Sequence, residues 1–432
     1  MSEQKNFDRR NFLTGALAAA ACGPLSGAIL PDCVDQGTQS RRIAPHGDTP
    51  VYAEEKPAPA PVEYKRKIKL GVVGNGGRGG WIAGLFKKHG GYEMHALCDY
   101  FPTVVDKCGD TLGVDKSRRF STLSGYKKLI ESGVEAVALE CIPYFMPEQA
   151  KAVIDAGLHL YMAKPVAVDV PGALSIEASA KAATQKKRVF LVDYQMPTDP
   201  THIEVYKRVK DGALGKIAQV QTFGCCGGFS DPPKTANLES RMQSLIWCND
   251  TAMGCGYLGN FDIHAIDCAI WALGKKPVSA AGASNLTRPN PHGDSHDVSS
   301  VIFEYADGLI HNHYGHALAN NSDGLLDCRI FGTTANALFS YWFGKGYVRG
   351  GDKHFAGKVE NLYEAGAQRN IAAFYQNVIG EKYENETAQR AVDGVLTCVL
   401  AREAALRHTK LTMDDILKEN KKLEVDLTGL KS

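Results

Sequence analysis

A short apolar segment that runs straight into a glycine-rich turn is the feature that most limits how this chain can fold. Residues 68–73 are largely apolar, as in a buried strand. In a strand-turn-helix unit the first glycine makes the turn tight, the second lets the backbone approach a diphosphate, and the third lets the helix pack closely on the strand. Free N–H groups at the helix start then favour bound phosphate. The pattern predicts a dinucleotide site formed by Gly74, Asn75, Gly76, Gly77, Arg78 and Gly79.

A second strand-like segment, residues 92–98, ends at an acidic residue, Asp99. In dinucleotide sites an acid about 20 residues beyond the glycine turn accepts hydrogen bonds from the ribose hydroxyls. A carboxylate there repels a 2′-phosphate, and Tyr100-Phe101-Pro102 offers no arginine to bind one, so NAD is predicted over NADP. Arg78 is the cation that could reach the adenosine side instead. A glycine turn with only a structural role is the alternative.

Strand-like and helix-like segments alternate up to about residue 193, and the pattern then changes. The first part predicts a Rossmann-type, doubly wound parallel sheet over residues 65–195. Strands with period-2 character then dominate, which predicts an α+β domain with an open, mostly antiparallel sheet over residues 196–420. We expect this domain to bind substrate and to form subunit contacts, with its last helices packing on the first domain. The expected strands are 68–73, 93–98, 136–140, 159–162 and 189–192, then 216–226, 299–305, 309–314, 326–331 and 335–341.

Length and charge narrow the range of partners. At 432 residues and 44% hydrophobic content, the chain can bury two cores. Its net charge of +1 is spread over interspersed acidic and basic residues, so there is no basic surface of the kind that binds nucleic acid. We therefore expect a small-molecule ligand and no nucleic acid.

The first residues predict export. Arg9-Arg10 precedes an Ala/Gly-rich segment from Thr14 to Leu30, which is typical of a twin-arginine signal over residues 1–35 and a periplasmic protein. The segment is too short and too weakly apolar for a membrane span. A lipid anchor at Cys22 and a chance basic pair are the alternatives. Residues 36–64 are polar and Pro-rich, as in an extended linker.

The chain contains 12 cysteines, which an exported protein could pair. A twin-arginine substrate folds before export in a reducing compartment, so we expect most of them to be unpaired thiols. Cys98, Cys141, Cys268 and Cys398 lie in apolar patterns and read as core residues. The remaining candidates for metal or disulfide chemistry are Cys225-Cys226 and the Cys248/Cys255 pair, and neither has the CxxC spacing.

Two separate segments carry residues suited to acid–base chemistry. Lys164 directly follows a predicted parallel strand, at the sheet edge where ligands bind, and can donate to a substrate hydroxyl. His264 opens an apolar helix with Asn260 four residues earlier on the same face. A histidine beside a nicotinamide can take the proton of the C–OH group whose hydride departs. A solvated lysine and a structural histidine are the alternatives.

Together these features resemble the glucose–fructose oxidoreductase/inositol dehydrogenase (Gfo/Idh/MocA) family. The resemblance covers roughly residues 68–416 and rests on the Gly74–Gly79 turn, Lys164-Pro165, Tyr194-Gln195-x-x-x-Asp199-Pro200 and His264-x-x-Asp267-x-x-x-Trp271-x-x-Gly274. Members bind NAD or NADP and act on carbinol carbons of sugars, cyclitols or glycosides. The resemblance implies a NAD(P)-dependent oxidoreductase with Lys164 and His264 as the catalytic pair, and we place Tyr194 and Asp267 on the substrate side.

The chain departs from the family pattern at three positions. Ala163 stands where a glutamate usually precedes Lys-Pro, and Pro143-Tyr-Phe-Met-Pro147 lacks the usual histidine. Asn260 stands where an aspartate usually precedes the catalytic histidine by four residues. Because an amide cannot accept a proton as a carboxylate does, the base role falls on His264 or on Asp262.

Three functions fit these sequence features. The first is an exported oxidoreductase that holds its cofactor and reduces and reoxidises it in each cycle, because no nicotinamide pool exists outside the cytoplasm. The second is a NAD-dependent glycosidase that oxidises, eliminates, hydrates and reduces at the same site. The third is a catalytically silent binding or scaffold protein, since fold alone does not imply activity.

Other residues are assigned by their segments. The long polar loop of residues 226–259 is expected to wall the substrate pocket, with Trp247 stacking on a sugar ring and Arg241 binding its hydroxyls, or to be a plain surface loop. His311 and His313 share one face of a strand. The roles of His311, His313 and His316 are left open, and no metal site is assigned to them. The open sheet predicts a homo-oligomer, with Phe303, Tyr305, Phe331 and Phe339 among its outward residues.

Overall fold

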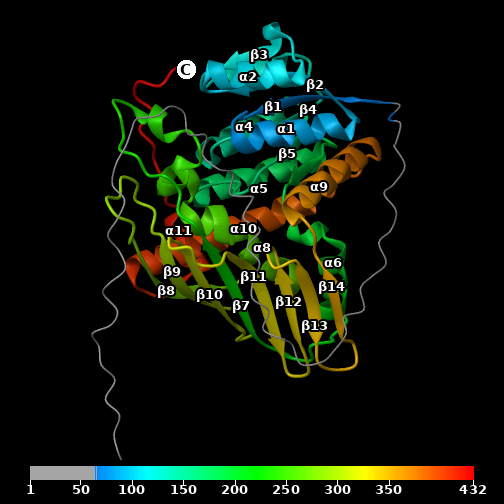
Figure 1. Ribbon diagram of the computed structural model, residues 1–432, viewed down its shortest axis with the longest axis vertical. Coiled ribbons are helices and arrows are strands. Elements are labelled where there is room, and N and C mark those ends of the chain that lie inside the picture. Colours follow the sequence, from blue (N-terminus) through cyan, green and yellow to red (C-terminus); the bar gives the residue numbers. More distant parts are fainter. Residues whose placement is uncertain (1–63, 65) are drawn as a thin grey trace, which may run out of the picture. The chain divides into compact units, whose positions relative to one another are not determined.

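The computed structural model describes residues 64 and 66–432 (Figure 1). The predicted twin-arginine signal, Cys22 and nearly all of the predicted linker lie outside the described residues. The described chain contains a six-stranded and a nine-stranded sheet. None of its helices is long and apolar enough to cross a membrane.

The first sheet is parallel throughout, with the strand order β3-β2-β1-β4-β5-β6. This order reverses direction at β1 and β4, which is where doubly wound sheets bind ligands at the carboxyl ends of their strands. The predicted Rossmann-type fold is confirmed. The strands are β1 (Ile68–Val73), β2 (Tyr92–Asp99), β3 (Arg119–Ser121), β4 (Ala136–Leu139), β5 (His159–Met162) and β6 (Phe190–Val192).

Helices cover both faces of this sheet (Figure 1). On one face Ile82 and Phe86 pack with Leu70, and on the other Val153 and Ile176 pack with Val137. The strands are buried on both faces, which explains why they read as continuous apolar segments. The helices are α1 (Gly77–His89), α2 (Pro102–Leu112), α3 (Gly125–Glu131), α4 (Met146–Asp155) and α5 (Val170–Gln185).

The second sheet has the order β14-β13-β12-β11-β7-β10-β9-β8-β15. In the part of the chain that the structure describes, β10 and β7 run parallel and the other pairs of this sheet are antiparallel, as predicted. The strands are β7 (Ile217–Cys226), β8 (Ser279–Asn285), β9 (Val298–Glu304), β10 (Ile310–Ala317), β11 (Leu325–Gly332), β12 (Asn336–Ser340), β13 (Lys345–Arg349), β14 (Phe355–Lys358) and β15 (Leu411–Thr412).

Helices α6 (Pro200–Lys210) and α8 (Ile263–Leu273) cover the inner face of the second sheet. Asp199 caps α6 by accepting from the backbone N–H groups of Thr201 and His202. Nearly every residue of α8 is buried, because the sheet covers one side and helix α10 (Glu386–Arg407) the other. A helix that is apolar all round has to lie inside a core.

The last helices link the two sheets. Helix α9 (Leu362–Ile379) packs on α1, and the Tyr92 hydroxyl donates to the carbonyl of Ile371 at 2.7 Å. Helix α10 contacts α5 as well as α8 and β8, and helix α11 (Met413–Glu419) contacts α10. Ile176, Phe303 and Val395 belong to one apolar cluster, so the described domains share a continuous core.

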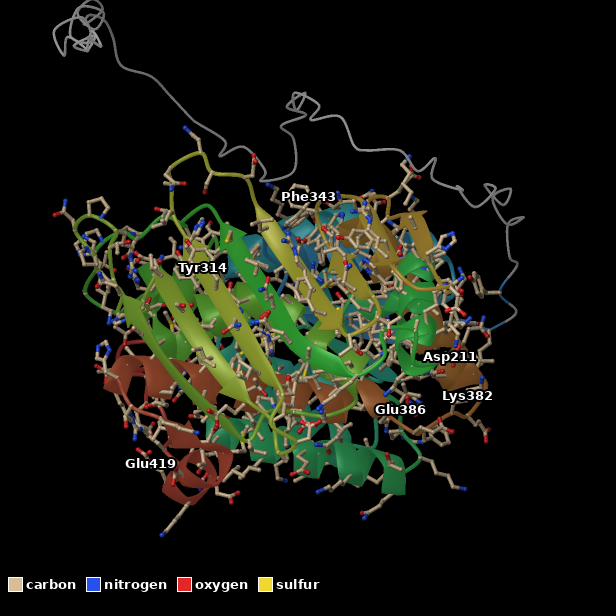
Figure 2. The ribbon with its side chains drawn as sticks, turned by 90° about the horizontal axis from the view of Figure 1, so that it is seen from below. Asp211, Tyr314, Phe343, Lys382, Glu386 and Glu419 are labelled. Atoms are coloured by element: carbon tan, nitrogen blue, oxygen red, sulfur yellow. The ribbon has the colours of Figure 1, made fainter. Side chains whose placement is uncertain are left out.

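The outer face of the second sheet differs from the prediction. Phe303, Tyr305 and Phe339 are buried on the inner side, so their predicted outward placement is wrong, and Phe331 is half-buried. Side chains alternate along a strand, and β9 directs Val301 and Phe303 inward, which leaves Ser300, Ile302 and Glu304 outside. The exposed apolar residues of this face are Ile302, Ile310 and Tyr314, the last of which is labelled in Figure 2.

Candidate functional site

The glycine turn after β1 has the geometry that its sequence requires. Gly74 has a φ of 87°, in the left-handed region. A Cβ on Gly79 would lie 1.9 Å from the carbonyl oxygen of Gly74, so only glycine lets α1 start this close to β1. Gly76 and Gly77 face open space, and no side chain caps the start of α1. The free N–H groups of this helix start fit the diphosphate of a dinucleotide.

Asp99 lies at the end of β2, beside the turn. Its carboxylate accepts hydrogen bonds from the backbone N–H groups of Asn75, at 2.7 Å, and Phe101, at 3.0 Å. Burial raises its pKa, and these hydrogen bonds oppose the rise. Asn75 is itself buried, with its side-chain oxygen unpartnered. The glycine turn and the partly exposed carboxylate of Asp99 therefore lie side by side. A dinucleotide needs the first for its diphosphate and the second for its ribose hydroxyls.

An apolar cluster surrounds the strand ends on this side of the first sheet. Its first-domain members follow β2, β3 and β4, and its other members come from the long loop of the second domain and from the residues after α11. Trp247, predicted to stack on a sugar ring, lies half-buried in this cluster. The members are Tyr100, Phe101, Leu123, Ile142, Tyr144, Phe145, Leu238, Met242, Trp247, Met253, Val425 and Leu430.

The carboxyl-terminal segment after α11, residues 420–432, runs across this cluster. The N–H of Lys431 donates to the hydroxyl of Tyr100 at 3.1 Å, and the carbonyl of Lys431 accepts from the N–H of Leu123 at 3.0 Å. The side chain of Asn237 donates to the carbonyl of Gly429 at 3.3 Å. The segment therefore connects both domains next to Asp99.

Four charged side chains meet at the carboxyl ends of the first sheet. Glu140 follows β4, Lys164 follows β5 and Asp193 follows β6, while Arg78 reaches in from α1. The Arg78 guanidinium contacts Asp193 and lies 3.4 Å, Nε to Oε2, from Glu140. Both carboxylates are fully buried, and the side chain of Arg78 is 27% exposed. The structure thus directs Arg78 toward the strand ends.

Lys164 reaches from the first domain to the second. Its Nζ donates a hydrogen bond to the backbone carbonyl of Asn260. Burial, with the nearby Arg78 cation, lowers the pKa of Lys164 to about 8. An ammonium group with this pKa can donate to a substrate hydroxyl and still exchange a proton near neutral pH.

His264 lies in the first turn of α8 and is 8% exposed. Its Nδ1 has no hydrogen-bond partner among the described residues. Burial lowers its pKa well below the usual value, and the charges of Lys164 and Arg78 lower it further. The imidazole is therefore neutral at pH 7 and can accept a proton. The rings of Tyr194 and Tyr341 lie 6.2 and 5.3 Å from it, centroid to centroid.

Asn260 and Asp262 lie in a π-helical turn, Leu258–Asp262, just before α8. Such wide turns are frequent at functional sites. The carboxylate of Asp262 faces the second sheet, where a Cβ on Gly224 would lie 2.0 Å from Oδ1 and one on Gly315 would lie 2.2 Å from Oδ2. Asp262 pairs there with His313 at 3.0 Å, and burial raises its pKa. Asn260 therefore presents its backbone to Lys164, while Asp262 presents its carboxylate to the sheet.

The strand histidines have separate surroundings. Thr222 Oγ1 lies 2.9 Å from Nδ1 of His313 and 2.7 Å from Nε2 of His311, and Tyr305 continues the row at 3.3 Å from His311. This buried row could not be read from the sequence, because Thr222 belongs to a different strand. His316 is half-buried beside Tyr314. Within the described residues, no three His, Cys, Asp or Glu side chains form a group that could hold a metal ion.

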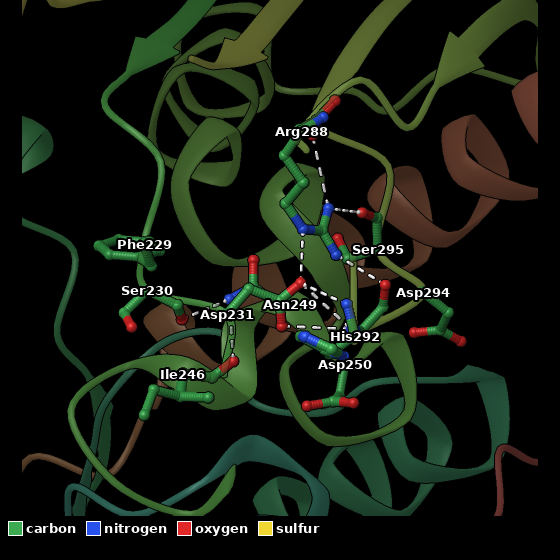
Figure 3. A network of polar contacts seen from close by, with 12 residues as sticks. Phe229, Ser230, Asp231, Ile246, Asn249, Asp250, Arg288, His292, Asp294 and Ser295 are labelled. Atoms are coloured by element: carbon green, nitrogen blue, oxygen red, sulfur yellow. Dashed lines mark hydrogen bonds and ion pairs between the residues drawn. The ribbon is translucent and has the colours of Figure 1, made fainter. Parts of the chain in front are cut away.

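The remaining predicted substrate residues make ion pairs. Arg241 is fully buried between Asp231, at 2.7 Å, and Asp250, whose carboxylate lies 2.8 Å from its Nε. Asp231 also accepts from Arg288 at 2.7 Å, and Figure 3 shows the polar contacts around these two side chains. Asp267 accepts from Arg390 at 2.7 Å, and burial raises the pKa of Asp267 to about 6.

The structure thus divides the predicted site residues into groups. Lys164 donates to the backbone carbonyl of Asn260, and its charge, with that of Arg78, acts on His264. Tyr194 lies edge-on to His264, and the guanidinium of Arg390 lies 5.7 Å from the Tyr194 ring centre. Arg241 orders the long loop through its carboxylate partners. Glu140 and Asp193 were not predicted, because nothing in their local sequence shows that three strand ends and α1 bring them together.

Residues 202–337 match the family model of the GFO/IDH/MocA C-terminal domain. The chain is 21% identical over 248 residues to an inositol 2-dehydrogenase of Rhizobium meliloti, which covers 56% of this chain and 66% of that protein. It is 24% identical over 220 residues to glycosyl hydrolase family 109 protein 4 of Phocaeicola vulgatus, which covers 47% of this chain and 40% of that protein. The matches therefore span under two thirds of these relatives.

Solved structures agree with the fold along nearly their whole length. The levoglucosan dehydrogenase complex with NADH has a TM-score of 0.67 at 16% identity, and it covers 81% of this chain and 99% of its own. The aldose-aldose oxidoreductase from Caulobacter crescentus, complexed with glycerol, has a TM-score of 0.66 at 17% identity. The match covers 80% of this chain and 100% of that one. The fold is thus a Rossmann-type domain followed by a domain with a mostly antiparallel sheet, and residues 202–337 of the second domain match the GFO/IDH/MocA C-terminal domain model.

Proposed function

We propose that this protein is a NAD-dependent oxidoreductase that acts on a carbinol carbon of a sugar or glycoside. One observation carries the proposal: Lys164 and a neutral His264 meet at the sheet edge that also holds the glycine turn and Asp99. The similarity to an inositol 2-dehydrogenase and to a levoglucosan dehydrogenase complex with NADH supports the class of reaction and the cofactor.

Each residue has a role in this proposal. A nicotinamide bound here would supply the hydride acceptor for the carbinol carbon and the hydride that is later returned. His264 takes the hydroxyl proton, since its imidazole is neutral. Lys164 donates to the same oxygen and orients it, while the carbonyl of Asn260 fixes its ammonium group. The oxidation then balances as one hydride leaving the carbon and one proton passing to the enzyme.

The preference for NAD rests on the end of β2. Asp99 places a partly exposed carboxylate beside the turn, and Tyr100-Phe101-Pro102 follows without a cation. Arg78, the cation that could have bound a 2′-phosphate, contacts Asp193 and Glu140 instead. A similar structure, GenD2 from gentamicin A biosynthesis, contains NAD; it is 20% identical, with a TM-score of 0.66, over 82% of this chain and 99% of its own.

We further propose that the protein is exported to the periplasm and keeps its cofactor through each cycle. The sequence Arg9-Arg10 and the apolar segment after it support export. The carboxyl-terminal segment supports retention, because it ties Tyr100 and Leu123 of the first domain to the loop of the second. We therefore expect a dinucleotide at this sheet edge to leave more slowly while the segment is docked.

The test is direct. The protein, purified as it is expressed, is mixed with a panel of mono- and disaccharides while the absorbance of bound reduced nicotinamide is followed. We expect a neutral hexose-type sugar or glycoside to change that signal. Absence of nicotinamide from the protein, together with failure to bind any, contradicts the proposal. A response to a non-carbohydrate alcohol alone contradicts the substrate class.

The second candidate is a glycosidase that uses the same residues. The similarity to glycosyl hydrolase family 109 protein 4 favours it. The neutral imidazole of His264 could remove the proton next to a newly formed carbonyl, so that the aglycone is eliminated before water adds and the carbonyl is reduced. Release of free sugar from a nitrophenyl glycoside without net NADH would favour this candidate over a net oxidation.

Assembly is a further part of the proposal. The outer face of the second sheet exposes Ile302, Ile310 and Tyr314, each close to half of its maximum area. Antiparallel register puts Ile302 next to Asn312 between the other two, so the three form one patch. We propose that this patch is buried in a homo-oligomer, a dimer or tetramer. A monodisperse monomer in light scattering at micromolar concentration contradicts it.

A further inference from the structure

The carboxyl group of Glu140 has no role in the reaction described above. In the sheet order, its strand β4 lies between β1, which leads into the glycine turn, and β5, which ends at Lys164. A Cβ on Gly79 would lie 3.1 Å from the Cβ of Glu140, and the backbone of Glu140 contacts Gly74. A dinucleotide that reaches from the turn to Lys164 therefore passes Glu140.

The surroundings of Glu140 do not satisfy its charge. The side chain is fully buried, and neither carboxylate oxygen has a hydrogen-bond partner among the described residues. Arg78 is 3.4 Å away but directs its stronger contact to Asp193. Asp193 has further donors in Asn370, at 2.7 Å, and Gln195, at 2.9 Å. One guanidinium thus serves two carboxylates, and Glu140 is the one left without other donors.

We propose that Glu140 stores the proton of the reaction: it binds a proton when the nicotinamide at this site is reduced and releases it when the nicotinamide is reoxidised. The inference rests on the proposed oxidoreductase function and extends it. Glu140 acts through Lys164 and His264, which exchange the proton with the substrate oxygen. No net proton is consumed, since the proton taken from the carbinol hydroxyl is the one returned to the carbonyl oxygen.

Electrostatics supply the physical reason. Hydride transfer removes one positive charge from the site, and a neighbouring buried carboxylate then binds a proton more tightly. Burial raises the pKa of Glu140 to about 7 even though Arg78 opposes the rise, and Asp193 raises it further. Its protonation is therefore balanced at neutral pH, where a change of one charge has the largest effect. The titratable groups that face it are Arg78, Cys141, Tyr161, Lys164 and Asp193.

The experiment counts protons without turnover. NAD and NADH are bound separately to the full-length protein, freed of nucleotide, by calorimetry at pH 7 in buffers of different ionisation enthalpy. We expect NADH binding to take up more protons than NAD binding, by up to one proton, and the difference to disappear in Glu140→Gln. The control Glu135→Gln alters an exposed carboxylate paired with Arg66 and should keep the wild-type difference.

Each outcome is informative. An equal proton count for both nucleotides in the wild type, or an unchanged difference in Glu140→Gln, overturns the inference and leaves the proposed function intact. Failure of both nucleotides to bind overturns the proposed function as well. If Glu140→Gln does not fold, the infrared difference spectrum of the wild-type complexes is the second test: a proton stored on Glu140 must add a carboxylic acid band in the NADH complex, and absence of that band overturns the inference.

Discussion

The Nζ of Lys164 donates to the backbone carbonyl of Asn260, and this hydrogen bond joins the carboxyl end of β5 to the π-helical turn before α8. The contact spans the two domains. It brings the lysine to the helix that carries His264, although Lys164 and His264 are 100 positions apart in the sequence. The partner is a backbone atom, so the contact does not depend on whether residue 260 is an asparagine or an aspartate.

Removing the lysine tests its role. We expect Lys164→Ala to lower the rate of cofactor reduction by a substrate about 10²- to 10⁴-fold, the range for loss of a positioned proton donor. Binding of NAD should change little, because Asp99 and the glycine turn remain. The measurement is a single-turnover absorbance trace. Lys181→Ala, on the exposed surface of α5, is the matched control, and an equal loss in both variants contradicts the role of Lys164.

The pH dependence of oxidation follows from two shifted groups. His264 must be neutral to accept a proton, and its lowered pKa keeps it neutral well into the acidic range. Lys164 must be protonated to donate, and its pKa of about 8 means that this form is lost as pH rises through about 8. We therefore expect kcat/KM for oxidation to fall above pH 8. Lys164→Arg should move this limb to higher pH, and a limb that stays in place assigns it to another group.

Much of the fold could be predicted because it is encoded locally. The apolar segment of residues 68–73, the glycines after it and the apolar helix that follows Asp262 each carry their pattern within a few residues. Strands β3, β8, β13, β14 and β15 were not predicted. β8 reads Ser-Ala-Ala-Gly-Ala-Ser-Asn, without the β-branched and aromatic residues of a typical strand, and it forms because β9 and β15 pair with it.

The candidate site could be predicted only where one segment defines it. Gly74, Lys164 and His264 follow recognisable motifs. The placement of Glu140, the row from Asp262 to Tyr305 and the contacts of residues 420–432 depend on segments that are distant in the sequence. Phe303, Tyr305 and Phe339 were assigned to the wrong face because period-2 alternation does not say which of the two faces is covered by helices.

The buried ion pairs of the long loop should contribute to stability. Arg241 lies between Asp231 and Asp250, so Arg241→Met leaves the carboxylate of Asp250 without its main cation and that of Asp231 with Arg288 alone. We expect a loss of about 3–5 kcal/mol in the free energy of unfolding, measured by denaturant titration. Arg349→Met, at an exposed position on β13, is the control and should change this energy by less than about 1 kcal/mol. Equal stabilities for the two variants contradict the interpretation.

The carboxyl-terminal segment should control nucleotide release. Leu430 is half-buried in the apolar cluster beside Tyr100, so Leu430→Ala weakens the docking of residues 420–432. A loss of about 1.4 kcal/mol in docking would raise the release rate of bound NADH about tenfold. The measurement follows fluorescence after a chase with excess unlabelled NAD. Leu406→Ala, at an exposed position on α10, is the control, and equal release rates would show that the segment does not retain the nucleotide.

The outer sheet face should control assembly. Tyr314→Glu places a charge in the patch formed with Ile302 and Ile310, and a buried unpaired charge is costly in an apolar interface. We expect the molar mass from light scattering to fall to that of the monomer at micromolar concentration, with the circular dichroism spectrum unchanged. Leu406→Glu adds the same charge at an exposed apolar position on α10 and should leave the assembly intact. If Tyr314→Glu keeps the wild-type mass, subunits do not meet through this face.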